Sequence, residues 1–137
     1  MSDPRVRVQQ LIERDREERI REIAESMMSL ASFQRGRLRF YPISQMITYV
    51  PDDGKEFRVP LAPKPFNAAL YLAKRPGVIF SRYHLAYLIA IHDESSDRAI
   101  DSVIKVFRRA VGKASGNTCN PIVTVYGAGY RWVTELD

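Results

Sequence analysis

The sequence lacks several features that would place it in whole classes of protein. It contains one cysteine, Cys119, so no disulfide can form within the chain, and a single thiol fits a reducing compartment. No apolar run approaches the roughly 20 residues that a membrane-spanning helix needs. Charges from Asp3 onward leave no apolar segment for a secretion signal. We therefore expect neither a membrane protein nor a disulfide-stabilised one.

The residue patterns that support catalysis or metal binding are also missing. His84 and His92 stand eight residues apart, and no fourth ligand at a fixed spacing joins them and Cys119 in a metal site. Ser81 near His84 fits a helix cap followed by a surface residue better than a nucleophile and its base. The stretch Gly127-Ala128-Gly129 lies between predicted strands and precedes no helix, so it does not predict a phosphate-binding loop. The sequence predicts no enzyme, no metal site and no cofactor.

The composition is that of an ordinary globular domain with a positive charge balance. The 137 residues are 45% hydrophobic and 27% charged, which suits one compact domain plus an extension. The net charge of +5 favours an anionic partner, and nucleic acid is the commonest one. A charge of this size also occurs in small domains that bind nothing acidic, so it does not decide the function alone.

The first 36 residues form a segment with its own character. Glycine is absent before Gly36, and charged residues crowd the run from Glu13 to Glu25. Apolar residues then repeat at coiled-coil spacing for about two heptads: Ile20, Ile23, Met27 and Leu30. A helix this charged is marginal alone, so it must pack against something. The sequence favours a homodimer contact through these four residues, and docking on its own domain or on another protein remains open.

The pattern changes after Gly36, and residues 37–137 predict one further domain. Residues 37–42, 45–50 and 56–61 are rich in β-branched and aromatic residues, which predicts an antiparallel sheet over 37–61. Helices are predicted over 63–74, 82–91 and 95–112, the last ending at Gly112. The final segment, PIVTVYGAGYRWVTEL, predicts a β-hairpin turning at Gly127-Ala128-Gly129. Phe107, Tyr130 and Trp132 are candidate core residues.

The helix over 95–112 has two unlike faces. An apolar stripe at three- and four-residue spacings consists of Ala99, Ile100, Val103, Ile104, Phe107, Ala110 and Val111. The other flank carries Arg98, Asp101, Ser102, Lys105, Arg108 and Arg109. The first face fits a core. The second is either a solvated surface or a surface that contacts nucleic acid.

Three blocks in order carry a resemblance to a known family: LAPKPFNAALYLAKRPGVIFSR, SDRAIDSVIKVFRRAVG and NPIVTVYGAGYRWV. They resemble the effector domain of OmpR/PhoB-type response regulators over residues 37–135. The resemblance implies an α+β winged helix-turn-helix with an N-terminal antiparallel sheet, three helices and a C-terminal hairpin wing, here preceded by the charged helix. It implies a transcriptional regulator that binds double-stranded DNA in the bacterial cytoplasm, on the nucleoid.

In this family the third helix enters the major groove and the wing reaches an adjacent minor groove. The resemblance therefore implies a phosphate clamp at Arg98 and groove-facing positions at Ser102, Val103, Lys105 and Val106. Further DNA contacts or supporting positions fall on Arg108, Arg109, Thr124, Tyr126 at the wing tip, and Tyr130. The loop of Ile91, His92, Asp93 and Glu94 matches the connection that touches RNA polymerase in activating members.

The sequence also departs from the family pattern. Members usually carry two adjacent basic residues where this chain has Lys105-Val106, and Arg where it has Tyr126. They often carry a polar residue where it has Val103. Valine can touch a thymine methyl but cannot donate to guanine, so we expect a shift toward A·T pairs or a loss of affinity. Ala62 replaces the usual Thr and Pro65 the usual Glu, which removes a capping box.

The segment ahead of the domain departs most of all. A full response regulator has a phosphoacceptor receiver there, and 36 residues of this composition are too few for a parallel α/β sheet. We therefore expect a receiverless regulator that is not switched by phosphorylation within its own chain. The alternative, favoured by the weakened basic set, is a winged helix repurposed for contact with RNA polymerase or another regulator, with weak or non-specific DNA binding.

Overall fold

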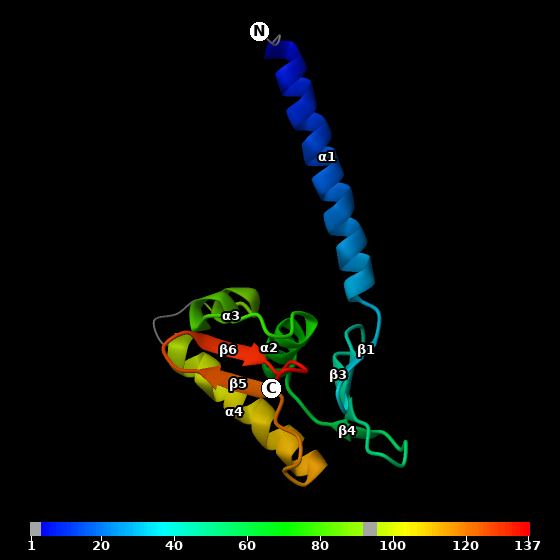
Figure 1. The fold of residues 1–137 in the computed structure, drawn as a ribbon, viewed down its shortest axis with the longest axis vertical. Helices are drawn as coiled ribbons and strands as arrows, with labels where there is room; N and C mark the ends of the chain where they lie inside the picture. Colours follow the sequence, from blue (N-terminus) through cyan, green and yellow to red (C-terminus); the bar gives the residue numbers. More distant parts are fainter. Residues whose placement is uncertain (1–3, 92–95) are drawn as a thin grey trace. The chain divides into compact units, whose positions relative to one another are not determined.

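The computed structural model describes residues 4–91 and 96–137, and within the first helix it describes the side chains of residues 5–18. The chain divides into two units, Met1–Ala31 and Ser32–Asp137 (Figure 1). This division falls ahead of residue 36, where the sequence placed it. The reason is that Phe33–Arg35 forms a strand of the second unit's sheet.

The first unit is one continuous helix, α1, from Pro4 to Ser29. All of its described side chains are exposed, including the apolar residues Val8, Leu11 and Ile12. Leu30, at the end of the expected dimer contact, is 49% exposed, whereas the side chains of Ile20, Ile23 and Met27 lie outside the described part. No helix in the described part of the chain is long and apolar enough to span a membrane.

The second unit begins with a four-stranded antiparallel sheet in the order β1-β2-β3-β4. Its strands are β1 Phe33–Arg35, β2 Leu38–Tyr41, β3 Met46–Tyr49 and β4 Phe57–Val59. The three strands expected from the sequence are confirmed. Strand β1 was not expected, because three residues are too few to display an alternating pattern. It pairs with β2 in the register Arg35↔Leu38 through a tight turn in which Gly36 has φ +58°.

Three helices follow the sheet: α2 Pro63–Lys74, α3 Arg82–Leu88 and α4 Ser96–Ser115. Helix α4 passes through Gly112, so the expected end at that residue was wrong. Gly112 is buried in the helix, and a Cβ there would lie 2.8 Å from the Asn117 Oδ1 atom. The left-handed residue that follows the helix is instead Gly116, with φ +62°.

The core lies between the sheet, helices α2 and α4, and the C-terminal hairpin. The Trp132 ring joins the parts, with its centroid 5.8 Å from that of Phe40 and 6.1 Å from that of Phe107. Phe66 of α2 packs against Phe40 at 6.3 Å. Aromatic pairs of this kind contribute about 0.5–1.5 kcal/mol each beyond their burial. The expected core positions Phe107, Tyr130 and Trp132 are confirmed.

The C-terminal hairpin consists of β5 Ile122–Val125 and β6 Gly129–Trp132, as expected. Phe80 extends it, because its N–H donates to the Tyr130 carbonyl (2.8 Å) and its carbonyl accepts from the Tyr130 N–H (2.9 Å). Gly129 has φ +143°, and a Cβ there would lie 2.0 Å from the Phe80 oxygen, so this contact requires glycine. Sheet, helices and hairpin together form the expected α+β winged helix (Figure 1).

Candidate nucleic-acid interface

Helix α4 is held by one face, and this fixes which residues point outward. Ile100, Ile104, Phe107 and Val111 have at most 1% of their surface exposed and pack into the core. The opposite face carries Arg98, Ser102, Lys105 and Arg109, whose spacings of four, three and four place them on one stripe. All four are exposed, and Val106 beside them is 45% exposed.

The cations of this stripe are available to a ligand. Arg98, Lys105 and Arg109, with Lys113 one turn further on, form no hydrogen bond or ion pair with any residue that the structure describes. A guanidinium or ammonium group that stays in water without a partner retains its full capacity to bind an anion. The stripe therefore presents unpaired positive charge along the exposed length of one helix.

Val103 does not belong to this stripe. The resemblance placed it among the groove-facing residues, but it lies in the hydrophobic core and is 9% exposed. Its spacing from Ile100 and Phe107 puts it on the apolar face, as the periodicity alone had indicated. The structure thus gives Val103 a packing role, and its burial argues against a contact with a base.

Arg108 is also turned away from the exposed stripe. Its Nη2 donates to the Ile122 carbonyl and to Thr124 Oγ1, both at 2.9 Å, and its guanidinium lies 5.7 Å from the centroid of the Tyr130 ring. The Nε atom is buried and has no partner among the described atoms. Arg108 and Thr124 therefore join α4 to the wing, which is a supporting position rather than a free phosphate contact.

Tyr130 fixes a second junction between the wing and the helices. Its hydroxyl donates to Asp101 Oδ1, which also accepts from Arg82 Nε at 2.9 Å. Burial, followed by the hydrogen bond to Asp101, raises the pKa of Tyr130, so the phenol stays a neutral donor. Arg82 of α3 was not anticipated as part of this junction, although it is the last residue of the block LAPKPFNAALYLAKRPGVIFSR that carries the family resemblance. Its partner Asp101 lies 19 positions further along, and nothing in the sequence pairs them.

The wing tip is open to solvent. Tyr126 is 93% exposed, and Gly127 and Ala128 beside it are exposed as well. A 340 Å³ cavity joins this turn to the first turn of α4, since Tyr126, Ala128 and Asp97 all line it. Tyr126 therefore lies at the end of the wing that is next to the first turn of α4, and Arg98 belongs to that turn.

The loop before α4 is described only at its start. Ile91 is 8% exposed, and its N–H donates to the Ala86 carbonyl at 2.8 Å. Ile91 therefore anchors the loop in the domain. His92, Asp93 and Glu94, the remaining residues of the expected polymerase-contact loop, lie outside the described residues.

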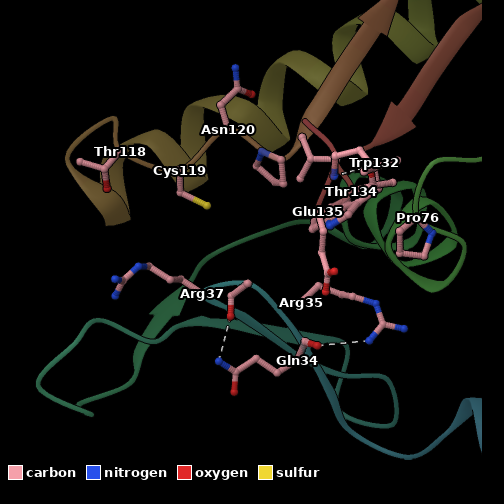
Figure 2. Close-up of a pocket in the computed structure, with 14 residues that line it drawn as sticks. Gln34, Arg35, Arg37, Pro76, Thr118, Cys119, Asn120, Trp132, Thr134 and Glu135 are labelled. Atoms are coloured by element: carbon pink, nitrogen blue, oxygen red, sulfur yellow. Dashed lines mark hydrogen bonds between the residues drawn. The ribbon is translucent and has the colours of Figure 1, made fainter.

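A larger cavity of 920 Å³ lies elsewhere, between the β1–β2 turn, the loop at Thr118–Pro121 and the segment after β6 (Figure 2). Its cations are already engaged. Arg35 Nε donates to the Ala73 carbonyl at 2.9 Å, and Arg37 pairs with Asp52. Cys119 faces this space, and burial raises the pKa of its thiol, so the sulfur stays protonated at neutral pH. The cavity lacks the unpaired positive charge that the α4 stripe offers.

The sequence of residues 54–132 matches the family model described as "Transcriptional regulatory protein, C terminal". The chain belongs to this family. It carries the OmpR/PhoB-type winged-helix DNA-binding domain, as the resemblance had implied. The exposed α4 stripe therefore lies on a domain of a DNA-binding family.

Relatives and solved structures agree with this membership. The transcriptional regulatory protein ResD of Bacillus subtilis is 33% identical over 84 residues, which are 61% of this chain and 34% of ResD. The chain thus spans about a third of the length of the curated relatives it matches. The DNA-binding domain of CpxR from E. coli superposes with a TM-score of 0.62 at 25% identity, covering 76% of this chain and 97% of that one.

The Klebsiella pneumoniae RstA DNA-binding domain, solved in complex with the RstA box, superposes with a TM-score of 0.58. It covers 74% of this chain and 96% of that one at 24% identity. Likeness at this level of identity shows the shared fold alone.

Proposed function

We propose that this protein is a sequence-specific transcriptional regulator that inserts α4 into the DNA major groove and its wing into an adjacent minor groove. The observation that carries this proposal is the exposed stripe of Arg98, Ser102, Lys105 and Arg109 on a helix whose other face is packed in the core. An α-helix fits the major groove, and the position of the wing beside the start of α4 suits a second contact.

The residues of the stripe make different contacts with DNA according to their position along α4. Arg98 and Arg109 stand near its two ends, where they can bind phosphates on either side of the groove. Ser102 and Lys105 lie between them and can reach base edges, Lys to guanine acceptors and Ser to either partner of a pair. Tyr126 at the wing tip can donate its hydroxyl to a phosphate. Positioning and base reading thus fall to different residues.

Selection of bound DNA tests this proposal. The full chain is mixed with fragments of its own genome over a series of salt concentrations, and the recovered fragments are sequenced. We expect a shared motif that survives moderate salt. Arg98→Ala should weaken binding to all sequences alike and lower the salt slope by about one. Arg75→Ala, which removes an exposed arginine from the end of α2, is the matched control. Undiminished binding by Arg98→Ala would contradict the proposal.

We further propose that α1 pairs two copies of the protein on DNA. The heptad spacing of Ile20, Ile23, Met27 and Leu30 supports this assignment. The joint variant Ile23→Glu with Met27→Glu should convert a dimer into a monomer in sedimentation equilibrium. Leu11→Glu, outside the repeat, is the control. A wild-type chain that sediments as a monomer at all concentrations would refute the dimer.

A contact with RNA polymerase is proposed on the resemblance alone. Ile91 is buried, so we assign the contact to the residues that follow it. Charge reversal at Glu94, with DNA affinity unchanged, should reduce activated transcription in a reconstituted assay. Unchanged transcription would refute this assignment.

A further inference from the structure

A groove with an unusual combination of surfaces runs between β4 and the C-terminal half of α4. This β4–α4 groove is lined on the β4 side by Phe57, Arg58 and Pro60, and on the α4 side by Val106, Arg109, Ala110, Lys113 and Ala114. Its volume is 610 Å³. That is room for several side chains of a partner molecule.

The floor of the groove is apolar and exposed. Phe57 is 51% exposed and Val106 is 45% exposed, while Ala110 and Ala114 are small enough to leave space between them. Val59, two positions along β4 from Phe57, is buried in the core at 2% exposure. The sheet therefore buries Val59 and leaves about half of the Phe57 side chain in contact with solvent, where a partner could cover it.

The rim of the groove is positive. Arg58, Arg109 and Lys113 line the groove together with the apolar residues, and no acidic residue lines it. Within the described ranges 4–91 and 96–137, none of these three cations has a hydrogen-bond or ion-pair partner. Unpaired cations beside exposed apolar side chains define the complementary ligand, which must supply both anionic groups and apolar groups.

DNA satisfies only half of this description. Its phosphates can pair with Arg109 and Lys113, but its backbone alternates phosphates with sugars and offers no continuous apolar face that could cover Phe57 on the sheet. A protein segment with an apolar face and acidic flanks meets both requirements, since its apolar side chains enter the groove and its carboxylates reach the rim. We propose that the β4–α4 groove binds an acidic amphipathic segment of a partner protein.

Such a partner would compete with DNA. Val106 and Arg109 line the groove and also lie on or beside the α4 stripe that the proposed function gives to DNA, so this consequence rests on that function. An acidic segment in the groove would cover part of the stripe and place carboxylates near the path of the phosphates. The regulator would then be switched off by the bound protein without any change in its own fold.

Fluorescence anisotropy of a labelled helical peptide, with leucines on one face and glutamates on the other, tests the proposal on the full chain. We expect saturable binding, displacement of the peptide by DNA selected as above, and little binding of the same peptide with lysines for glutamates. Phe57→Ser should weaken peptide binding about tenfold or more, since central apolar contacts dominate such interfaces. The control Ile43→Ser removes a residue that is 77% exposed in the β2–β3 turn and should change nothing.

A second pair of variants separates charge from packing. Arg58→Glu should abolish peptide binding, whereas Lys55→Glu, an equal charge change in the preceding turn, should have a small effect. Neither Phe57 nor Arg58 lies on the α4 stripe, so DNA binding by Phe57→Ser should be retained. Absence of peptide binding, equal binding of the lysine peptide, or full binding by Phe57→Ser would overturn the proposal.

Two further results have distinct meanings. Self-association that Phe57→Ser abolishes, in the absence of peptide, would assign the groove to a second copy of the chain and overturn the acidic partner. Peptide binding that persists while no DNA is selected would uphold the groove and refute the proposed function.

Discussion

Arg108 Nη2 and Thr124 Oγ1 lie 2.9 Å apart, so helix α4 is bonded directly to the first strand of the wing. Both residues would pass for phosphate contacts on the strength of the family resemblance. The structure instead uses the arginine to hold the hairpin against α4, with Tyr130 beneath the guanidinium. Under the proposed function, helix and wing contact two grooves at once, and this bond helps to fix the angle between the two parts.

Replacing Thr124 by valine should therefore destabilise the domain. The change keeps the shape of the side chain and removes the acceptor, leaving the half-buried Arg108 with the Ile122 carbonyl alone. We expect a loss of about 1 kcal/mol in the free energy of unfolding, measured by urea denaturation. Thr124→Ser keeps the hydroxyl and should retain most of the stability. Equal stability of the valine and wild-type proteins would show that the bond contributes nothing.

The phenol of Tyr130 gives a second measurable contribution. Tyr130→Phe deletes the donor to Asp101 while leaving the ring that packs beside Arg108. We expect the domain to lose about 1–2 kcal/mol, because a hydrogen bond to a charged acceptor is lost at a nearly buried site. Tyr126→Phe, at a position that is 93% exposed, is the matched control and should leave thermal unfolding unchanged.

The same tyrosine predicts a dependence of stability on alkaline pH. Burial and the bond to Asp101 raise its pKa above the ordinary value of 10.0. A group whose pKa is raised by folding contributes stability below the unfolded pKa, and this stability is lost as the pH rises through the folded pKa. The free energy of unfolding of the wild type should therefore fall above about pH 10, more steeply than that of Tyr130→Phe. Parallel curves would contradict the assignment.

Gly129 and Gly127 offer a test of the close contact between the wing and Phe80. In Gly129→Ala the new Cβ would lie 2.0 Å from the Phe80 carbonyl oxygen, so the hairpin or the Phe80 segment has to move. We expect a cost above about 2 kcal/mol. Gly127→Ala, with φ +80° and nothing within 4 Å of the new Cβ, should cost only about 1 kcal/mol. Urea denaturation of the two variants gives the comparison, and a reversed order would refute this account.

The sequence predicted elements well where a pattern is local. The helix at Pro63–Lys74 and the hairpin around Gly127-Ala128-Gly129 follow from nearby residues, and the structure has both. Strand β1 was not predicted, because three residues are too few to show the alternation of a strand. It is a strand through its pairing with β2. Gly112 looked like a helix end because the packing of Asn117 against it cannot be read from neighbouring residues.

The candidate nucleic-acid interface was likewise predictable where it depends on a local pattern, and not where it depends on contacts between distant segments. Exposure of Arg98, Ser102, Lys105 and Arg109 follows from the period of α4, once its apolar face is known. The period also placed Val103 in the core, and the resemblance placed it at a base; the structure agrees with the period. The bonds of Arg108 to Thr124 and of Arg82 to Asp101 join segments far apart in the chain, and no local pattern reports such contacts.

Val106 offers a gain-of-function test of α4 as the DNA-reading helix. It is 45% exposed beside Lys105, at a position where the family resemblance leads us to expect a second basic residue. If α4 lies in the major groove, Val106→Arg should add one phosphate or guanine contact, raise affinity and steepen the salt slope by about one. Ile43→Arg adds the same charge in the β2–β3 turn, which we place away from the DNA, and should gain far less. Equal gains from both variants would mean that net charge alone attracts the DNA and that α4 does not read it.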